Sequence, residues 1–169
     1  MFVSRHMIQL VFGKQLVVNV LIFAHMTAGF FRVKVMGRRA KPTEAPILVL
    51  SPHSSYFDIL PFLLVGAPSP VGKVELTKTP FIGKMMMLTC PVLVNRESSQ
   101  SRWAVRDTIG RRAARVYRQP ASGSDQWPQL CIFPEGTCTN RSSVISFKTG
   151  AFQPGLPVQP VLLRWPTKP

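Results

Sequence analysis

Short, mostly apolar runs recur along this chain of 169 residues, and they restrict its fold more than any other feature. A strand that is buried on both faces of a parallel sheet reads as such a run, because neither of its faces meets water. The runs cover residues 47–50, 92–94, 130–133 and 158–163, and helix-forming segments lie between them at about residues 55–65, 81–89 and 99–117. This alternation predicts an α/β domain with a mostly parallel sheet flanked by helices. Residues 31–36 alternate in a strand-like way and predict a further strand.

The N-terminal 31 residues form a separate apolar segment, and residues 15–31 contain no Lys, Arg, Asp or Glu. This run is at or just under the length of a membrane-spanning helix, about 20 residues, and basic residues stand on both sides of it. A buried core helix and a cleaved signal peptide stay open, although Phe30-Phe31 offers no Ala-x-Ala cleavage site. We expect a helical segment, residues 1–31, inserted in a membrane or lying along its face, followed by one domain, residues 32–169.

The chain is strongly basic, with a formal net charge of +14. Such a charge attracts nucleic acid, anionic lipid or a polyphosphate ligand such as CoA. Six arginines lie on or at the end of the helix expected at residues 99–117, with Asp107 as its one acid. A solvated face and a docking surface for anionic lipid or CoA phosphates are both consistent with this pattern. Cys90, Cys131 and Cys138 form no ligand-spaced pair, so we expect reduced thiols and no metal site.

The segment Ser51-Pro-His-Ser-Ser-Tyr-Phe-Asp58 follows the first apolar run and holds a histidine and an aspartate. Five positions separate His53 from Asp58, which would leave their side chains about 140° apart on one regular helix. They can meet only if His53 lies in a turn and the helix begins after it, with Ser54 or Ser55 as its N-cap. Asp58 would then bind one ring nitrogen and leave the other free as a base. Taken alone, this common spacing favours a capping or core histidine.

Two other strand ends carry polar residues. Glu135 lies in a Pro-Gly turn after the run at residues 130–133, and Arg96 stands just beyond the run at residues 92–94. Lys148 follows in Phe147-Lys-Thr-Gly-Ala-Phe152. Each could be an ordinary surface cation or turn carboxylate. Parallel α/β sheets bind their ligands at the carboxyl ends of strands, so a base, a carboxylate and an arginine at three strand ends predict a common site.

These segments resemble, in order, the four motif blocks of the glycerolipid acyltransferase superfamily. The blocks read His53-x4-Asp58, Arg96, Phe133-Pro-Glu-Gly-Thr-Cys-Thr-Asn140 and Pro157-Val-Gln-Pro-Val161. Longer strings such as Pro52-His-Ser-Ser and Glu135-Gly-Thr-Cys-Thr-Asn-Arg-Ser142 are similar to the lysophosphatidylcholine acyltransferase branch. The resemblance extends from about residue 31 to residue 165.

The resemblance implies transfer of a fatty acyl group from acyl-CoA, a co-substrate, to the free hydroxyl of a lysophosphatidylcholine-like lysophospholipid. His53 would be the general base, oriented by Asp58, and no cofactor or metal would be needed. The implied binding residues are Arg96, Glu135, Gly136, Thr137 and Lys148 for the acceptor, and Pro157, Val158, Pro160 and Val161 on the acyl-CoA side. The implied location is a membrane, that of the endoplasmic reticulum.

Other expectations concern the C-terminus and competing functions. The chain ends at Pro169, soon after the fourth block, so we expect a C-terminal truncation that leaves Leu162, Leu163 and Trp165 partly exposed. No D-x-D-x-D-G loop occurs, so calcium control is not expected. The alternative function is a catalytically inactive member of the superfamily that binds membrane or lipid. A nucleic-acid-binding module would explain the charge but not the motif blocks, and a serine hydrolase would need a G-x-S-x-G elbow.

Overall fold

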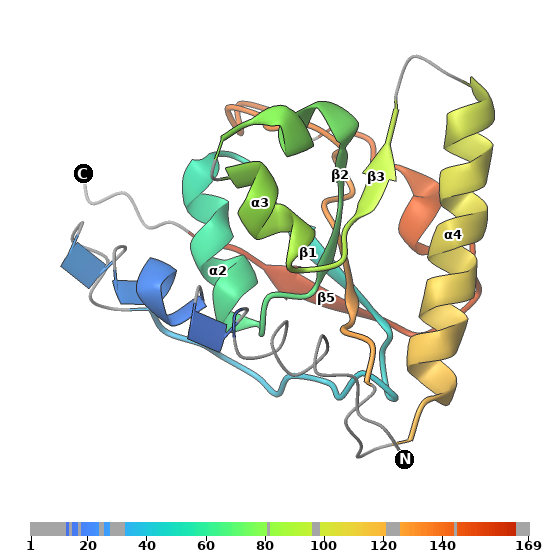
Figure 1. The fold of residues 1–169 in the computed structure, drawn as a ribbon, viewed down its shortest axis with the longest axis horizontal. Coiled ribbons are helices and arrows are strands. Elements are labelled where there is room, and N and C mark those ends of the chain that lie inside the picture. The colour runs from blue at the N-terminus through green and yellow to red at the C-terminus, as the bar shows by residue number, and fades with distance from the viewer. Residues whose placement is uncertain are drawn as a thin grey trace.

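The computed structural model describes residues 13, 15–16, 18–23, 26–27, 33–80, 82–95, 99–120, 126–143 and 145–164. Within them five strands form one sheet in the order β3-β2-β4-β1-β5, and every neighbouring pair is parallel (Figure 1). The strands are β1 (Ile47–Ser51), β2 (Ser69–Lys73), β3 (Val92–Val94), β4 (Leu130–Ile132) and β5 (Val158–Leu162). The α-helices are α2 (Ile59–Leu64), α3 (Ile82–Met87) and α4 (Ser99–Arg118); the 3-10 helices are η1 (Tyr56–Asp58), η2 (Val74–Lys78) and η3 (Thr149–Ala151). The predicted α/β class with a parallel sheet is confirmed.

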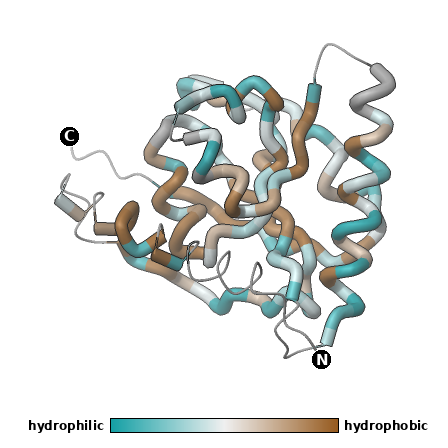
Figure 2. The backbone as a smooth tube through the Cα atoms, viewed as in Figure 1, coloured by the Kyte–Doolittle hydropathy of each residue, from teal (hydrophilic) through white to brown (hydrophobic). Residues whose placement is uncertain are grey.

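The centre of the sheet is buried on both faces, which explains why β1 and β4 read as continuous apolar runs. Ile47 and Val49 of β1 face a core that includes Ile109 and Ala113 of α4. The alternate residues of the strand belong to a second core, on the side of α2. Figure 2 shows this hydrophobic centre in brown, with more hydrophilic residues along α4. This packing on both faces fixes the positions of the central strands and therefore of the segments that follow their carboxyl ends.

Two predicted elements differ from the structure. Strand β2 was not predicted, because Ser69-Pro-Val-Gly-Lys73 contains a Pro and a Gly, which usually indicate a turn or a bulge. The strand predicted at residues 31–36 is wrong for its described part, since residues 33–36 adopt no regular structure. Val35 and Met36 are 75% and 79% exposed, so their alternation with basic residues does not mark a face that packs on a sheet.

The described part of the N-terminal segment is helical and partly packed. Val18 is buried in a small core with Leu63 of α2 and Ala67, while Leu16 and Phe23 are 65% and 68% exposed. Among the residues that the structure describes, no helix is long and apolar enough to cross a membrane. The expected helix inserted in a membrane or lying along its face stays a prediction.

At the other end of the described chain, the expected exposure differs between neighbouring leucines. Leu162 is 82% exposed, as expected, but the expectation for Leu163 is wrong, because it is only 7% exposed. Its backbone N–H donates to the carbonyl oxygen of Ser51 at 2.7 Å, which extends the pairing of β5 with β1. Trp165 lies outside the described residues.

Candidate active site

His53 and Asp58 are in direct contact. Their atoms Nδ1 and Oδ2 lie 2.8 Å apart, and His53 lies in the turn between β1 and η1 as the spacing required. The same Asp58 oxygen accepts the backbone N–H groups of Ser54 at 2.7 Å and Ser55 at 3.0 Å. One buried carboxylate, 2% exposed, therefore fixes both the histidine ring and the turn that carries it. Because the carboxylate accepts, Nδ1 carries the proton in the neutral ring, and Nε2 is the basic nitrogen.

The helix cap differs in detail from the prediction. Ser55 Oγ accepts the backbone N–H of Phe57 at 3.2 Å, so it caps the 3-10 helix η1. Helix α2 begins after Asp58, which makes no side-chain cap there because its carboxylate is turned back to the His53 loop. The 3-10 turn between Ser55 and α2 brings the two partners together despite their unfavourable spacing on a regular helix.

The pKa of Asp58 is set by two opposing effects. Burial alone would raise this pKa, because a low-dielectric environment disfavours the charged form. The hydrogen bonds from the His53 ring and from the backbone N–H groups of Ser55 and Ser54 outweigh burial and lower the pKa below its usual value. Asp58 is therefore an anion at neutral pH and stabilises positive charge on His53.

The other ring nitrogen of His53 points to a residue that the sequence did not single out. Nε2 lies 3.3 Å from Sγ of Cys138, and the ring stacks on Phe133 with 4.1 Å between centroids. The pKa of the Cys138 thiol is raised, first by desolvation and then by the carboxylates of Asp58 and Glu135. The thiol is protonated and exposed, so an incoming hydroxyl can displace it from Nε2.

Glu135 supports the histidine from the neighbouring strand. Its carboxylate accepts the hydroxyl of Ser51 at 2.6 Å and the backbone N–H of His53 at 3.1 Å, and the residue is 6% exposed. The backbone N–H of Thr139 donates to the carbonyl oxygen of His53 at 2.8 Å. Since β1 and β4 are paired, the segments after them are held side by side. The predicted role of Glu135 in acceptor binding stays a prediction; the contacts seen hold the His53 turn.

The other residues predicted for the acceptor are partly brought together. Gly136 has a φ of +70°, and a Cβ added to it would lie 3.7 Å from Cγ of Lys148. The backbone N–H of Lys148 donates to the carbonyl oxygen of Pro134 at 2.8 Å, and the Thr137 side chain is exposed nearby in sequence. Arg96 lies outside the described residues, two positions after β3 ends at Val94.

The residues predicted for the acyl-CoA side do not form one surface. Val158 packs against the core on the α4 side of the sheet, whereas Val161 packs against the core on the α2 side. Pro157 and Pro160 are exposed. This division follows from strand geometry, because successive side chains of β5 point to opposite faces. Their role toward acyl-CoA stays a prediction.

An apolar cavity of about 390 Å³ lies between α4 and the carboxyl ends of the strands. Its apolar wall consists of Val71, Val94, Val105, Ile109, Ile132 and Phe133. Gly136, Arg106 and Lys148 line it as well, so two cations accompany the apolar surface. Phe133 lines the cavity and also stacks on the His53 ring, so the cavity lies close to this histidine. Within the described residues, no group of His, Cys, Asp and Glu side chains could hold a metal ion.

The structure thus combines a parallel α/β sheet, a histidine oriented by an aspartate and an apolar cavity near that histidine. The chain belongs to the Acyltransferase family, whose model matches residues 32–164. It is 46% identical over 156 residues to lysophosphatidylcholine acyltransferase 2B of Mus musculus, covering 90% of this chain and 29% of that protein.

Two other relatives give the same picture. Lysophosphatidylcholine acyltransferase 2 of Rattus norvegicus is 49% identical over 138 residues, which are 82% of this chain and 24% of the relative. Lysophosphatidylcholine acyltransferase 1 of Danio rerio is 49% identical over 142 residues, 84% of this chain and 26% of the relative. The chain thus spans less than a third of the length of these relatives. No solved structure matches it.

Proposed function

We propose that this chain carries the acyl-transfer site of a lysophospholipid acyltransferase, with acyl-CoA as donor and a lysophosphatidylcholine-like lipid as acceptor. The observation that carries the proposal is the 2.8 Å contact between His53 and the buried Asp58, which leaves Nε2 as the base. The names of the similar relatives support the reaction and the acceptor class.

The proposed reaction is a single direct transfer. Nε2 of His53 takes the proton of the acceptor hydroxyl while the hydroxyl oxygen attacks the thioester carbonyl. The carbon–sulfur bond then breaks, and the CoA sulfur leaves as a thiol with the proton that His53 had taken. The Asp58 carboxylate stabilises the imidazolium between these steps. A positioned base contributes roughly 10²–10⁴-fold, so alignment of the two substrates supplies much of the remaining acceleration.

The acyl chain of the donor would lie in the cavity under α4. This cavity is mostly apolar and begins at Phe133, next to the base. The cations Arg106 and Lys148 at the same cavity could bind phosphate oxygens of either substrate. The inferred acyl site is therefore on the α4 side of the sheet rather than along β5.

The test is to combine the purified chain with lysophosphatidylcholine and acyl-CoA and to measure free CoA thiol and product lipid together. We expect equal amounts of both, and we expect His53→Ala to lower transfer by roughly 10²–10⁴-fold while acyl-CoA binding is kept. Near-normal transfer by His53→Ala would reject the mechanism. Release of CoA without product lipid would indicate a thioesterase, and lipid binding without either product would favour the inactive alternative.

A further inference from the structure

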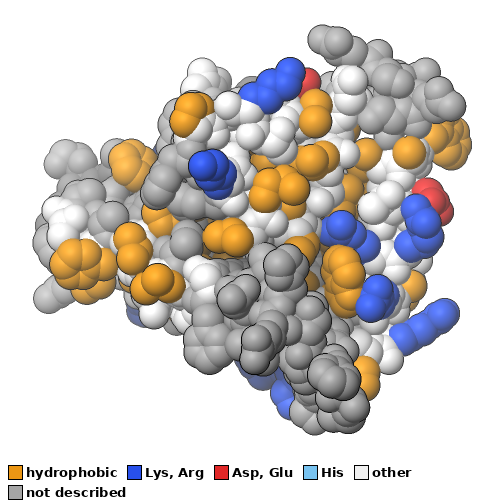
Figure 3. All heavy atoms as spheres, viewed as in Figure 1, with side chains coloured by type: hydrophobic (Ala, Val, Ile, Leu, Met, Phe, Trp, Pro, Cys, Tyr) orange, Lys and Arg blue, Asp and Glu red, His pale blue; other side chains and the backbone are white. Residues whose placement is uncertain are grey.

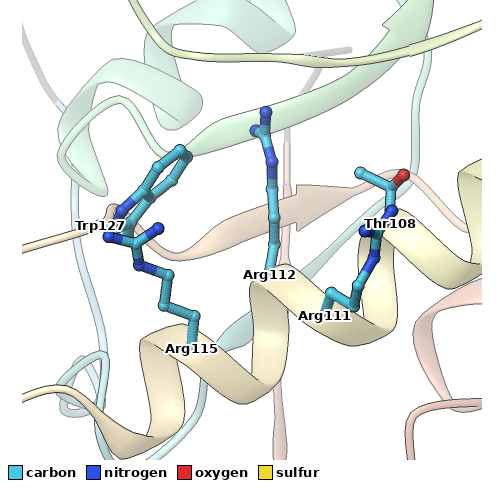
Figure 4. A pocket seen from close by; sticks show the side chains of 5 residues that line it. All are labelled: Thr108, Arg111, Arg112, Arg115 and Trp127. Carbon is cyan, nitrogen blue, oxygen red and sulfur yellow. The ribbon is translucent and has the colours of Figure 1, made fainter.

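A second surface pocket lies on α4, apart from the catalytic residues. It has a volume of about 270 Å³ and is lined by Thr108, Arg111, Arg112, Arg115 and Trp127, which we call the Arg–Trp cluster (Figure 4). Figure 4 shows Arg111 and Arg112 at neighbouring positions of the helix and Arg115 one turn further on, and the Trp127 ring contacts Arg112 and Arg115. Neither His53 nor any other residue given a catalytic role above contributes to it.

The cluster is ordered by specific contacts. The guanidinium carbons of Arg112 and Arg115 lie 5.0 and 4.7 Å from the centroid of the Trp127 ring. Trp127 is held in turn by Gln119, whose side-chain amide accepts the Trp127 backbone N–H at 2.7 Å and donates to its carbonyl oxygen at 3.0 Å. Arg112 also donates to the carbonyl oxygen of Cys90. The guanidinium groups of Arg112 and Arg115 are therefore both positioned by the same aromatic ring.

The charges of the cluster are poorly neutralised. Arg111 pairs with Asp107 at 2.9 Å, an exposed contact on the helix surface. In the part of the chain that the structure describes, no ion pair involves Arg112 or Arg115. Guanidinium groups that are ordered and have no carboxylate partner favour an anion with several oxygen atoms, and phosphate oxygens suit their planar geometry.

The cluster lies near the amino ends of the strands, whereas the catalytic residues lie at their carboxyl ends. Trp127 precedes β4 and Cys90 precedes β3, whereas His53 follows β1 and Glu135 follows β4. Because the strands are parallel and three to five residues long, their amino and carboxyl ends are separated by about 10–17 Å. A phosphate bound to the cluster is thus not at the site of acyl transfer.

The surroundings point to a lipid surface rather than to a single soluble phosphate. The arginines of α4 whose side chains are described extend from Arg106 to Arg118, about 18 Å along the helix, which exceeds the reach of one phosphate group. Exposed aromatic side chains accompany them, Trp103 at 70% and Tyr117 at 41%, and amphipathic aromatic residues are common at membrane interfaces. Figure 3 shows Lys and Arg side chains gathered with hydrophobic ones on the side where α4 runs.

We propose that the Arg–Trp cluster binds the phosphate groups of anionic phospholipids and docks the protein on a negatively charged membrane. This docking does not depend on acyl transfer and would persist in a chain without activity. Each arginine near an anionic surface strengthens binding roughly fivefold.

The test uses the full chain and vesicles of phosphatidylcholine with and without phosphatidylserine. Arg111 and Arg115 are both exposed, so Arg111→Gln with Arg115→Gln removes two charges without disturbing the core. We expect the part of binding that depends on phosphatidylserine to fall roughly 25-fold, and Arg111→Lys with Arg115→Lys to retain most of it. The matched control, Lys78→Gln with Lys84→Gln, removes the same charge from η2 and α3, where both lysines are exposed.

Three results would overturn the proposal. Equal losses in the arginine and lysine pairs would mean that net charge alone attracts the membrane. Unchanged vesicle binding in the arginine pair would mean that the cluster binds no lipid. A matching loss of affinity for CoA in solution, measured by calorimetry, would make the cluster a general phosphate site rather than a membrane-docking site.

Discussion

Asp58 is an acid buried between a histidine ring and two backbone N–H groups, and its ionisation is tied to folding. Because its pKa is lowered in the folded state, the carboxylate favours folding above its unfolded pKa, about 3.9, and loses that contribution as the pH falls through the lower folded value. We expect Asp58→Asn to destabilise the protein at pH 7 and to reduce the further loss below about pH 4. Urea denaturation at both pH values measures this, and a variant with an unchanged acid transition would contradict it.

The thiol of Cys138 lies 3.3 Å from the basic nitrogen of His53, so its role distinguishes two chemistries. The raised pKa of its thiol does not favour a nucleophile, and direct transfer needs no acyl-cysteine. We therefore expect Cys138→Ala to keep transfer within about tenfold of the original rate, far from the loss expected for a missing base. Measurement of kcat and KM for both substrates tests this. A loss as large as that of His53→Ala would favour a covalent relay through Cys138.

At the scale of elements, α4 and the strands beneath it enclose the cavity that we assign to the acyl chain. Val105 lines it and is only partly buried, so Val105→Phe should shorten the cavity. We expect long acyl-CoA donors to lose more kcat/KM than short ones, with a stability cost of about 1–3 kcal/mol from overpacking. Transfer rates across a series of chain lengths, with a thermal melt, provide the measurement.

The matched control for this prediction is Val35→Phe, which makes the same change at a position 75% exposed. It should leave the chain-length profile unchanged. A profile that does not change in Val105→Phe either, with transfer intact, would exclude this cavity as the acyl site.

Most strands of the sheet could be predicted from the sequence, and one could not. Strands β1 and β4 could be predicted because they are buried on both faces and read as apolar runs, and β3 and the partly exposed β5 also have mostly apolar sequences. Strand β2 could not, since Pro70 and Gly72 give it the composition of a turn. The contact between His53 and Asp58 could be predicted because the two residues are close in sequence. The hydrogen bond from the His53 backbone N–H to Glu135 joins residues 82 positions apart, so no local sequence pattern predicts it.

For the whole molecule, we expect two surfaces to contribute to membrane binding: the basic Arg–Trp cluster and an apolar surface near the N-terminus. The described N-terminal residues expose Leu16, Val20 and Phe23, spaced to lie on one side of a helix, while Val18 packs toward α2. We expect Leu16→Gln, Val20→Gln and Phe23→Gln together to remove most of the vesicle binding that survives high salt, because ions do not screen apolar burial.

Cosedimentation at low and high salt measures both contributions on one protein. The control is Leu162→Gln, which changes an 82% exposed leucine on β5 and should leave salt-resistant binding intact. Unchanged salt-resistant binding in the N-terminal variant would show that this surface is not the anchor. Loss of only the salt-sensitive part would assign its effect to electrostatics instead.

The contacts of Glu135 have a consequence for how this domain can diversify. The base, its orienting aspartate and the carboxylate that ties their loop all come from segments after two adjacent strands, β1 and β4. Four of the six residues of the apolar cavity wall come from β2, β3 and α4 instead, and the other two are Ile132 and Phe133. The residues proposed for proton transfer and most of the apolar cavity wall therefore lie on different elements of the domain. Exchange of α4 between relatives should alter which acyl chains are accepted while the histidine keeps its tautomer and orientation.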